Sequence, residues 1–449
     1  MRERKAALAG EGIGGADNAV LGRVPAPAAS SEAMRSRAWD RRRWGVLAAS
    51  CLVNLCIGSL YAWSVFASPM AAHLTAVNGF DVGSLAIVFS VANAVGPITM
   101  ISGGAVNDRL GPRWVILAGG VLFGGGMIGA GFSTNVAMLI GFYGLGCGLG
   151  MGLVYGAVVS NAVKFFPDKK GLVGGIVTAF YGISSVLVPL IANALIAALD
   201  VTAAFKVLGA AMLAVIVLCS LVIARCPEGY APAGWKPSGS GSSGETGGKD
   251  WRGMLTDPVF YVMMAMLCCG AFSGLMVTSQ ASALAQSLAG LDAAAAAVAV
   301  SLLALANTAG RIVAGFASDR WGAAVALRRV FLLLVAGMMA LCMAKGSVLG
   351  LFFGGLLVTG FCFGSVMGIY PGFTASQFGA RHNSVNYGIM FVGFALAGIV
   401  GPLMMNGLYG LFDSYVPAFL VAALLAATGA ALTRVYASVT DKGGAILSK

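Results

Sequence analysis

Apolar segments of about 20 residues, the length that spans a bilayer as a helix, recur along most of the chain and are separated by short polar turns. Each segment therefore predicts a membrane-spanning helix. We expect two sets of six helices, divided by a longer polar stretch. The first set is expected at residues 44–68, 84–106, 113–132, 136–162, 171–197 and 204–224; the second at 258–287, 295–317, 326–345, 348–374, 384–409 and 414–437. The predicted fold class is an all-α polytopic membrane protein with twelve transmembrane helices in two six-helix bundles.

The polar stretches divide the chain into five parts. Residues 1–43 are polar, contain no apolar run of signal-peptide length and end in three arginines, so we expect a disordered tail. Residues 225–257 are rich in Gly and Ser and have no periodicity, which is typical of a linker. The N-terminal bundle is then expected at 44–224, the C-terminal bundle at 258–437 and a C-terminal tail at 438–449.

A charged turn occurs at the same place in both halves. GAVNDRLG begins at Gly104, after the second helix of the first set, and GFASDRWG begins at Gly315, after the second helix of the second set. The two turns are 211 residues apart. Their equivalent positions indicate an internal duplication. We expect the charged residues of these turns to latch helices together in one state of a transport cycle: Asp108, Arg109, Arg113, Asp319 and Arg320.

Composition and charge agree with a membrane protein. Of the 449 residues, 58% are hydrophobic and 10% are charged, and the mean hydropathy is +0.87, which excludes a soluble globular protein. The net charge is +11, yet all but three of the 28 Lys and Arg residues lie on one predicted side of the membrane. The exceptions are Lys206, Lys345 and Arg311. The positive-inside rule places both termini and the linker in the cytoplasm, and we expect a multi-pass protein of the cell membrane. The positive charges thus set the orientation in the membrane, and they need no nucleic-acid partner.

Arg311 is the one charged residue predicted deep inside an apolar segment. It precedes Asp319 by eight residues, or roughly 12 Å along a helix, which is close to the middle of a hydrocarbon core about 30 Å thick. Burying a guanidinium there is costly, so such a residue is a functional-site candidate. No acidic residue lies in any expected span, and we therefore interpret Arg311 as the receptor for an anion. The alternative is that it only snorkels to the surface or caps backbone carbonyls.

The same spans contain no His, Asp or Glu that could form a nucleophile–base pair or bind a metal. We expect no enzyme, no metal and no cofactor, and interpret the nine Cys as small apolar side chains. A nutrient sensor would bind the same anion, but the tail and linker are too short for a signalling domain.

Six plus six helices, a central linker and the paired Gly-x-x-x-Asp-Arg-x-Gly turns resemble the major facilitator superfamily. Finer motifs resemble its oxalate/formate antiporter family, the microbial relatives of the monocarboxylate transporters. They are NLCIGSLYAWSVF from Asn54, NAVKFFPDKKGLVGG from Asn161, and NYG from Asn386. The resemblance implies a carboxylate held at the midplane between the halves, beside an arginine in the position of Arg311. It also implies a monomer.

The resemblance implies an aromatic cage around the carboxylate, with tyrosines at Tyr61, Tyr155 and Tyr181. Such phenols can donate hydrogen bonds to a carboxylate while their rings exclude water. The tyrosines could otherwise serve packing alone.

The sequence departs from the oxalate-exchanging pattern on helices 10 and 11. Phe394 stands where that type has a lysine, and Phe363 and Met367 stand where it has Trp and Tyr. One cation in a more apolar cage fits a monoanion, because a dianion would keep one charge uncompensated. We therefore expect a monocarboxylate transporter that works by alternating access. The alternative is an oxalate/formate-type exchanger with its second cation elsewhere.

A further departure concerns coupling. Animal monocarboxylate transporters resembling this fold have an aspartate one turn before the arginine, and here that position is Asn307. Asn does not titrate, so the chain shows no proton relay in its spans. The expected partners are the carboxylate, the lipid bilayer, and either a counter-anion or a proton.

Overall fold

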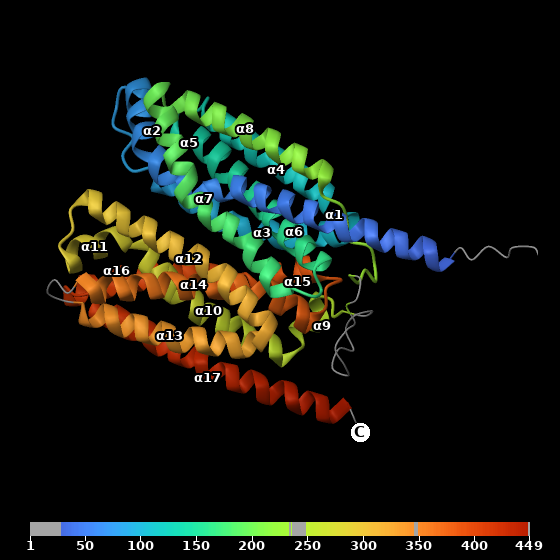
Figure 1. Cartoon of the computed structure of the whole chain (residues 1–449). Coiled ribbons are helices and arrows are strands. Elements are labelled where there is room, and N and C mark those ends of the chain that lie inside the picture. Colours follow the sequence, from blue (N-terminus) through green and yellow to red (C-terminus); the bar gives the residue numbers. More distant parts are fainter. Residues whose placement is uncertain (1–27, 233–234, 236–247, 345–348, 448–449) are drawn as a thin grey trace, which may run out of the picture.

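The computed structural model describes residues 28–232, 235, 248–344 and 349–447. The tail segment 1–27, residues 233–234 and 236–247 of the expected linker, residues 345–348 and the last two residues lie outside this part. Among the described residues, twelve helical stretches are long and apolar enough to cross a membrane. They form two bundles that lie side by side (Figure 1), as the hydrophobic pattern predicts.

The N-terminal bundle runs from α1 to α8. Its elements are α1 (Ala28–Ile57), η1 (Gly58–Ala62), α2 (Trp63–Asn78), α3 (Ala86–Leu110), α4 (Pro112–Ala130), α5 (Val136–Leu139), the π-helical η2 (Ile140–Cys147), α6 (Gly148–Phe165), α7 (Lys170–Ala198) and α8 (Val201–Val222).

The C-terminal bundle follows the linker. Its elements are α9 (Trp251–Leu255), α10 (Pro258–Ser279), α11 (Ala281–Ala289), α12 (Ala293–Trp321), α13 (Ala323–Met343), α14 (Leu349–Phe378), α15 (Asn383–Met390), α16 (Val392–Phe412) and α17 (Val416–Leu447).

The structure corrects the expected disorder in part of the N-terminal tail. Residues 28–43 are not disordered, because α1 begins at Ala28. Two contacts hold α1 just before its apolar run begins. Arg43 pairs with Asp168 at 3.2 Å, and the Tyr230 hydroxyl donates a hydrogen bond to Asp40. These contacts join α1 to the α6–α7 turn and to the start of the linker. Likewise α17 extends to Leu447, beyond the end of its apolar stretch.

The two charged turns have matching geometry. Gly111, between α3 and α4, has a φ of 90°, and Gly322, between α12 and α13, has a φ of 83°. Only glycine adopts such values without strain, which explains why a glycine closes each turn. The duplication indicated by the sequence is thus present in the backbone conformation.

Candidate functional site

Arg311 lies where three helices cross. A Cβ added at Gly175 of α7 or at Gly368 of α14 would overlap the backbone carbonyl of Arg311 on α12. A Cβ at Gly364 would overlap the carbonyl of Asn307, one turn earlier. Glycines on both neighbours therefore allow α7 and α14 to approach the α12 backbone closely. This packing buries Arg311, which keeps 6% of its surface accessible.

The guanidinium of Arg311 is bound from both halves of the protein. Its Nε donates to Oδ1 of Asn307 at 2.9 Å, within α12. Its Nη1 donates to the backbone oxygen of Thr178 at 3.0 Å, across the interface on α7. These bonds use two of the five guanidinium N–H groups. Asn307 thus orients the arginine, while Thr178 is a partner that no sequence motif indicated.

No carboxylate lies within ion-pair distance of Arg311 in the part of the chain that the structure describes. A buried charge with no counter-charge is costly. An anion that entered this site would supply the missing charge. The geometry therefore suits the binding of a carboxylate by the N–H groups left over.

Three tyrosines of the N-terminal half gather beside Arg311, close enough to interact electrostatically with it. The ring of Tyr181, on α7, lies 5.6 Å from that of Tyr61 on η1 and 5.1 Å from that of Tyr155 on α6, both edge to face. The structure thus brings together the four residues that the family resemblance grouped.

The aromatic cluster continues into the C-terminal half. The rings of Phe363 on α14 and Phe394 on α16 lie parallel, 6.4 Å apart. Phe391, just before α16, links them to the tyrosines, because it lies 4.5 Å from Phe394 and 5.7 Å from Tyr155. Met367 is buried on α14, one turn after Phe363. The rings of Phe363, Phe391 and Phe394 form an apolar wall that adjoins Tyr155.

Sequence reasoning missed two members of this cluster. Tyr387 of α15 is fully buried and stacks on Tyr155 with the rings 6.5 Å apart. Phe391 precedes Phe394 by three residues. Signals for both were present, since Tyr387 is the centre of the Asn-Tyr-Gly motif and Phe391 shares a helical face with Phe394.

Two carboxylates fasten the halves together at the end that carries the charged turns. Asp319 of α12 accepts from the backbone N–H groups of Gly171 and Leu172 at the start of α7, both at 2.7 Å. A carboxylate at a helix N-terminus is favoured by the helix dipole as well as by these bonds. Asp319 therefore joins the two bundles directly.

Asp108 occupies the equivalent place in the last turn of α3. It accepts from Lys164 at 2.9 Å and from the backbone N–H of Val385, in the first turn of α15, at 3.4 Å. Lys164 also donates to the Arg381 carbonyl oxygen across the interface at 3.1 Å. The duplicated turns thus supply two related contacts between the halves, at Asp108 and Asp319, which we call fasteners.

The arginines of the same turns behave differently. Among the described residues, Arg109, Arg113 and Arg320 form no ion pair, and Arg113 instead lies over the Trp114 ring. Their predicted role as latches remains a prediction.

The two halves meet closely at the end that carries the charged turns. In the described chain, close contacts between the halves extend from the charged turns to the level of Gly182 and Thr308. Tyr61, in the aromatic cluster, keeps 36% of its surface accessible.

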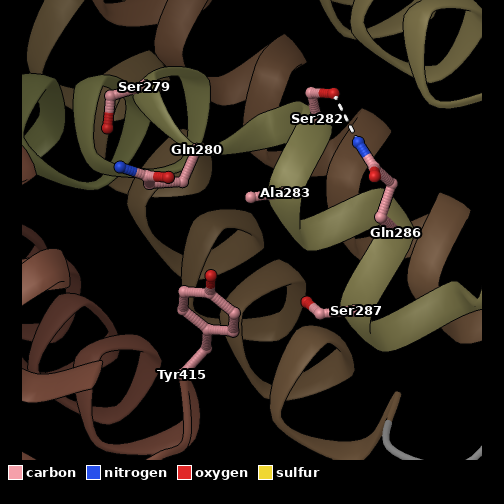
Figure 2. A pocket seen from close by; sticks show the side chains of 7 residues that line it. All are labelled: Ser279, Gln280, Ser282, Ala283, Gln286, Ser287 and Tyr415. Carbon is pink, nitrogen blue, oxygen red and sulfur yellow. Dashed lines mark hydrogen bonds between the residues drawn. The ribbon is translucent and has the colours of Figure 1, made fainter. Parts of the chain in front are cut away.

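A separate pocket of about 650 Å³ lies between α10, α11 and Tyr415, which directly precedes α17. Figure 2 shows its lining side chains: Ser279, Gln280, Ser282, Ala283, Gln286, Ser287 and Tyr415. Hydroxyls and amides line it without any cation. It is therefore a poor receptor for an anion compared with the surroundings of Arg311.

Comparison with known proteins shows which family the chain resembles. Residues 50–402 match the family described as Major Facilitator Superfamily. The chain is 29% identical to the oxalate:formate antiporter of Oxalobacter formigenes, over 80% of this chain and 83% of that protein. It is also 29% identical to an uncharacterized MFS-type transporter, YhjX, of Escherichia coli strain K12, over 80% of this chain and 87% of the relative.

A solved structure shares the fold. The crystal structure of the MFS transporter FucP in the outward conformation aligns with a TM-score of 0.66 and 15% identity, covering 86% of this chain and 98% of that one.

Proposed function

Because the chain belongs to the major facilitator superfamily and is therefore a multi-pass membrane transporter, we propose that it carries a small carboxylate anion, most simply a monocarboxylate, bound by Arg311. The family assignment agrees with the resemblance to the oxalate/formate antiporter family. The substrate and the central arginine are our proposal.

One observation carries the proposal. Arg311 is buried between the halves, hydrogen-bonded to Asn307 and Thr178, and lacks a carboxylate partner within the described chain. A substrate carboxylate would pair with the remaining N–H groups in a site of low polarity, where charge-assisted bonds are strong. Tyr61, Tyr155 and Tyr181 would add phenol donors from the opposite half.

The apolar wall selects the kind of anion. Phe363, Phe391 and Phe394 offer no charge and no hydrogen bond to a second carboxylate. A dianion would leave one charge uncompensated, which costs several kcal/mol in a buried site. A monocarboxylate with a short apolar body satisfies both the arginine and the phenyl rings.

Transport proceeds by alternating access of the site to the two sides of the membrane. The positive-inside rule puts the charged turns on the cytoplasmic side of the cell membrane. Asp108 and Asp319 then hold the cytoplasmic end closed in the present state. Opening that end breaks their bonds to the start of α15 and of α7 and lets the anion leave.

A second candidate is exchange of a dicarboxylate for a monocarboxylate. The similarity to the oxalate:formate antiporter favours it. It requires another cation beside Arg311 in some state of the cycle, because Phe394 supplies none.

The experiment that tests the proposal is uptake of labelled lactate, pyruvate, formate and oxalate into proteoliposomes. Parallel vesicles contain a trapped unlabelled anion, carry an inward proton gradient, or have neither. We expect uptake of a monocarboxylate and none of oxalate, and the three arms separate exchange, proton symport and uniport. Oxalate uptake that requires trapped formate would support the second candidate, and uptake of none of the four would refute the proposed substrate class.

A further inference from the structure

Exposed tryptophans at the end with the charged turns share a feature: an arginine lies over each ring. The pairs and their distances from guanidinium carbon to ring centroid are Arg43 over Trp44 (5.6 Å), Arg113 over Trp114 (5.9 Å), Arg252 over Trp251 (5.1 Å) and Arg329 over Trp321 (4.1 Å). Tryptophan prefers the boundary between acyl chains and water, and arginine binds phosphate with a planar fork. The pairs therefore mark a membrane surface on this end.

Most of these arginines have no protein counter-charge. Arg43 pairs with Asp168, whereas Arg113, Arg252 and Arg329 form no ion pair within the described chain. Arg328, next to Arg329, forms none there either. The neighbouring carboxylates are already used. Asp108 pairs with Lys164 and Asp257 with Lys249, Asp319 accepts from backbone N–H groups, and Asp250 caps α9.

The corner between α12 and α13 combines the closest of these pairs with an apolar surface. Trp321 ends α12 with 49% of its surface exposed, and Arg328 and Arg329 are exposed in the second turn of α13. Along α12 from this corner, Phe316 and Val313 are also more than half exposed. Cationic side chains thus lie at the edge of a long apolar face.

An apolar groove continues that face. It has a volume of about 480 Å³ and is lined by α12, α13 and α14. Helix α14 packs against both α12 and α13 (Figure 1). Its lining is Leu302, Leu305, Ala306, Ala309, Leu333, Leu357, Val358 and Phe361. Leu333 follows Arg329 by one helical turn, so the groove begins about 6 Å from the arginine along α13.

We propose that the α12–α13 corner is a binding site for an anionic phospholipid. Arg328 and Arg329 hold the phosphate and headgroup charge, Trp321 lies at the level of the glycerol backbone, and the groove beside Leu333 receives an acyl chain. Charge complementarity selects the headgroup, since a membrane supplies anionic phosphate at this depth. The uncharged groove favours a lipid over an acidic peptide, because a peptide bound there would leave its backbone polar groups without hydrogen-bond partners.

The site also has a structural connection to the rest of the protein. Ala306 and Ala309 line the groove on one face of α12, while Asn307 and Arg311 face the aromatic cluster on the other. A lipid bound in the groove would therefore pack on the helix that carries Arg311, and its binding would stabilise the folded transporter by linkage.

The test compares thermal unfolding of the purified full chain in detergent with added dioleoyl-phosphatidylglycerol or dioleoyl-phosphatidylcholine, titrated to give apparent affinities. The test variant is Arg328→Gln/Arg329→Gln. The control is Arg225→Gln/Arg434→Gln, which removes two exposed positive charges from the same end without touching a tryptophan or the groove. At about fivefold per arginine, the test variant is expected to lose about 25-fold of the preference for phosphatidylglycerol, while the control keeps it.

A groove variant separates the two parts of the site. Ala309→Phe fills the groove without changing charge, and we expect it to weaken binding of both lipids equally. Equal loss of preference in the test and control variants would show diffuse attraction only and would overturn the proposal. So would an unchanged affinity in Ala309→Phe.

Discussion

Replacing Asn307 by aspartate places a carboxylate beside the proposed anion receptor. In the structure, Oδ1 of Asn307 accepts from Nε of Arg311 at 2.9 Å, and Arg311 is 6% exposed. A carboxylate in this place puts the two charge centres about 4 Å apart, which is worth about 4 kcal/mol at an effective dielectric constant of about 20. The new carboxylate competes with the substrate for the same positive charge.

An energy of about 4 kcal/mol corresponds to nearly a thousandfold in affinity. Desolvation of the new carboxylate offsets part of it, so we expect carboxylate binding to weaken by roughly 10- to 1000-fold. Asn307→Leu is the matched control. It removes the hydrogen bond without adding charge and should cost roughly 1 kcal/mol, or about fivefold.

The assay is competition of unlabelled lactate, pyruvate and formate against the labelled anion that wild type carries, in proteoliposomes at constant pH. The difference between Asn307→Asp and Asn307→Leu isolates the effect of charge. Equal affinities in the two variants, in protein that elutes and unfolds like wild type, would refute the reasoning that the charge of Arg311 holds the substrate.

Three further changes test the fastener and the wall. Asp319→Asn weakens the charge-assisted bonds to Gly171 and Leu172, so hydrogen–deuterium exchange at the start of α7 should rise several-fold, and unchanged exchange would argue against a fastener at this place. Gly315→Ala adds a Cβ that overlaps the Gly171 carbonyl, and the same peptide should again exchange faster, with lower maximal uptake; wild-type values would contradict the close crossing. Phe394→Lys adds a cation to the apolar wall and should shift uptake towards oxalate by at least tenfold, whereas an unchanged ratio of oxalate to monocarboxylate uptake would count against the wall as the selector.

The hydrophobic pattern was sufficient to predict the architecture, because a bilayer requires helices of a set length and apolarity. The pattern predicted the helix ends less well where a helix extends beyond its apolar residues and makes polar contacts with other segments. Residues 28–43 are helical, and Asp40 and Arg43 contact the linker and the α6–α7 turn, which no local pattern reveals. The break at η1 after Ile57 was likewise not visible as a change in hydropathy.

The site was predicted in part. The depth of Arg311 followed from its distance to Asp319, and the three tyrosines followed from a family resemblance. The Thr178 carbonyl could not be predicted, since a backbone acceptor leaves no mark in the sequence. Tyr387 belongs to the Asn-Tyr-Gly motif, but its contact with Tyr155 depends on how α15 meets α6 across the interface.

The measurement that tests the central claim most directly is equilibrium binding of the carried carboxylate to purified Arg311→Gln, beside wild type and Arg225→Gln. Arg225 also carries one positive charge, but it lies at the start of the linker, where it pairs with Glu228 at 3.9 Å. We predict that binding is lost in Arg311→Gln and unchanged in Arg225→Gln. Wild-type affinity in a folded Arg311→Gln protein would contradict the assignment of this arginine as the anion receptor.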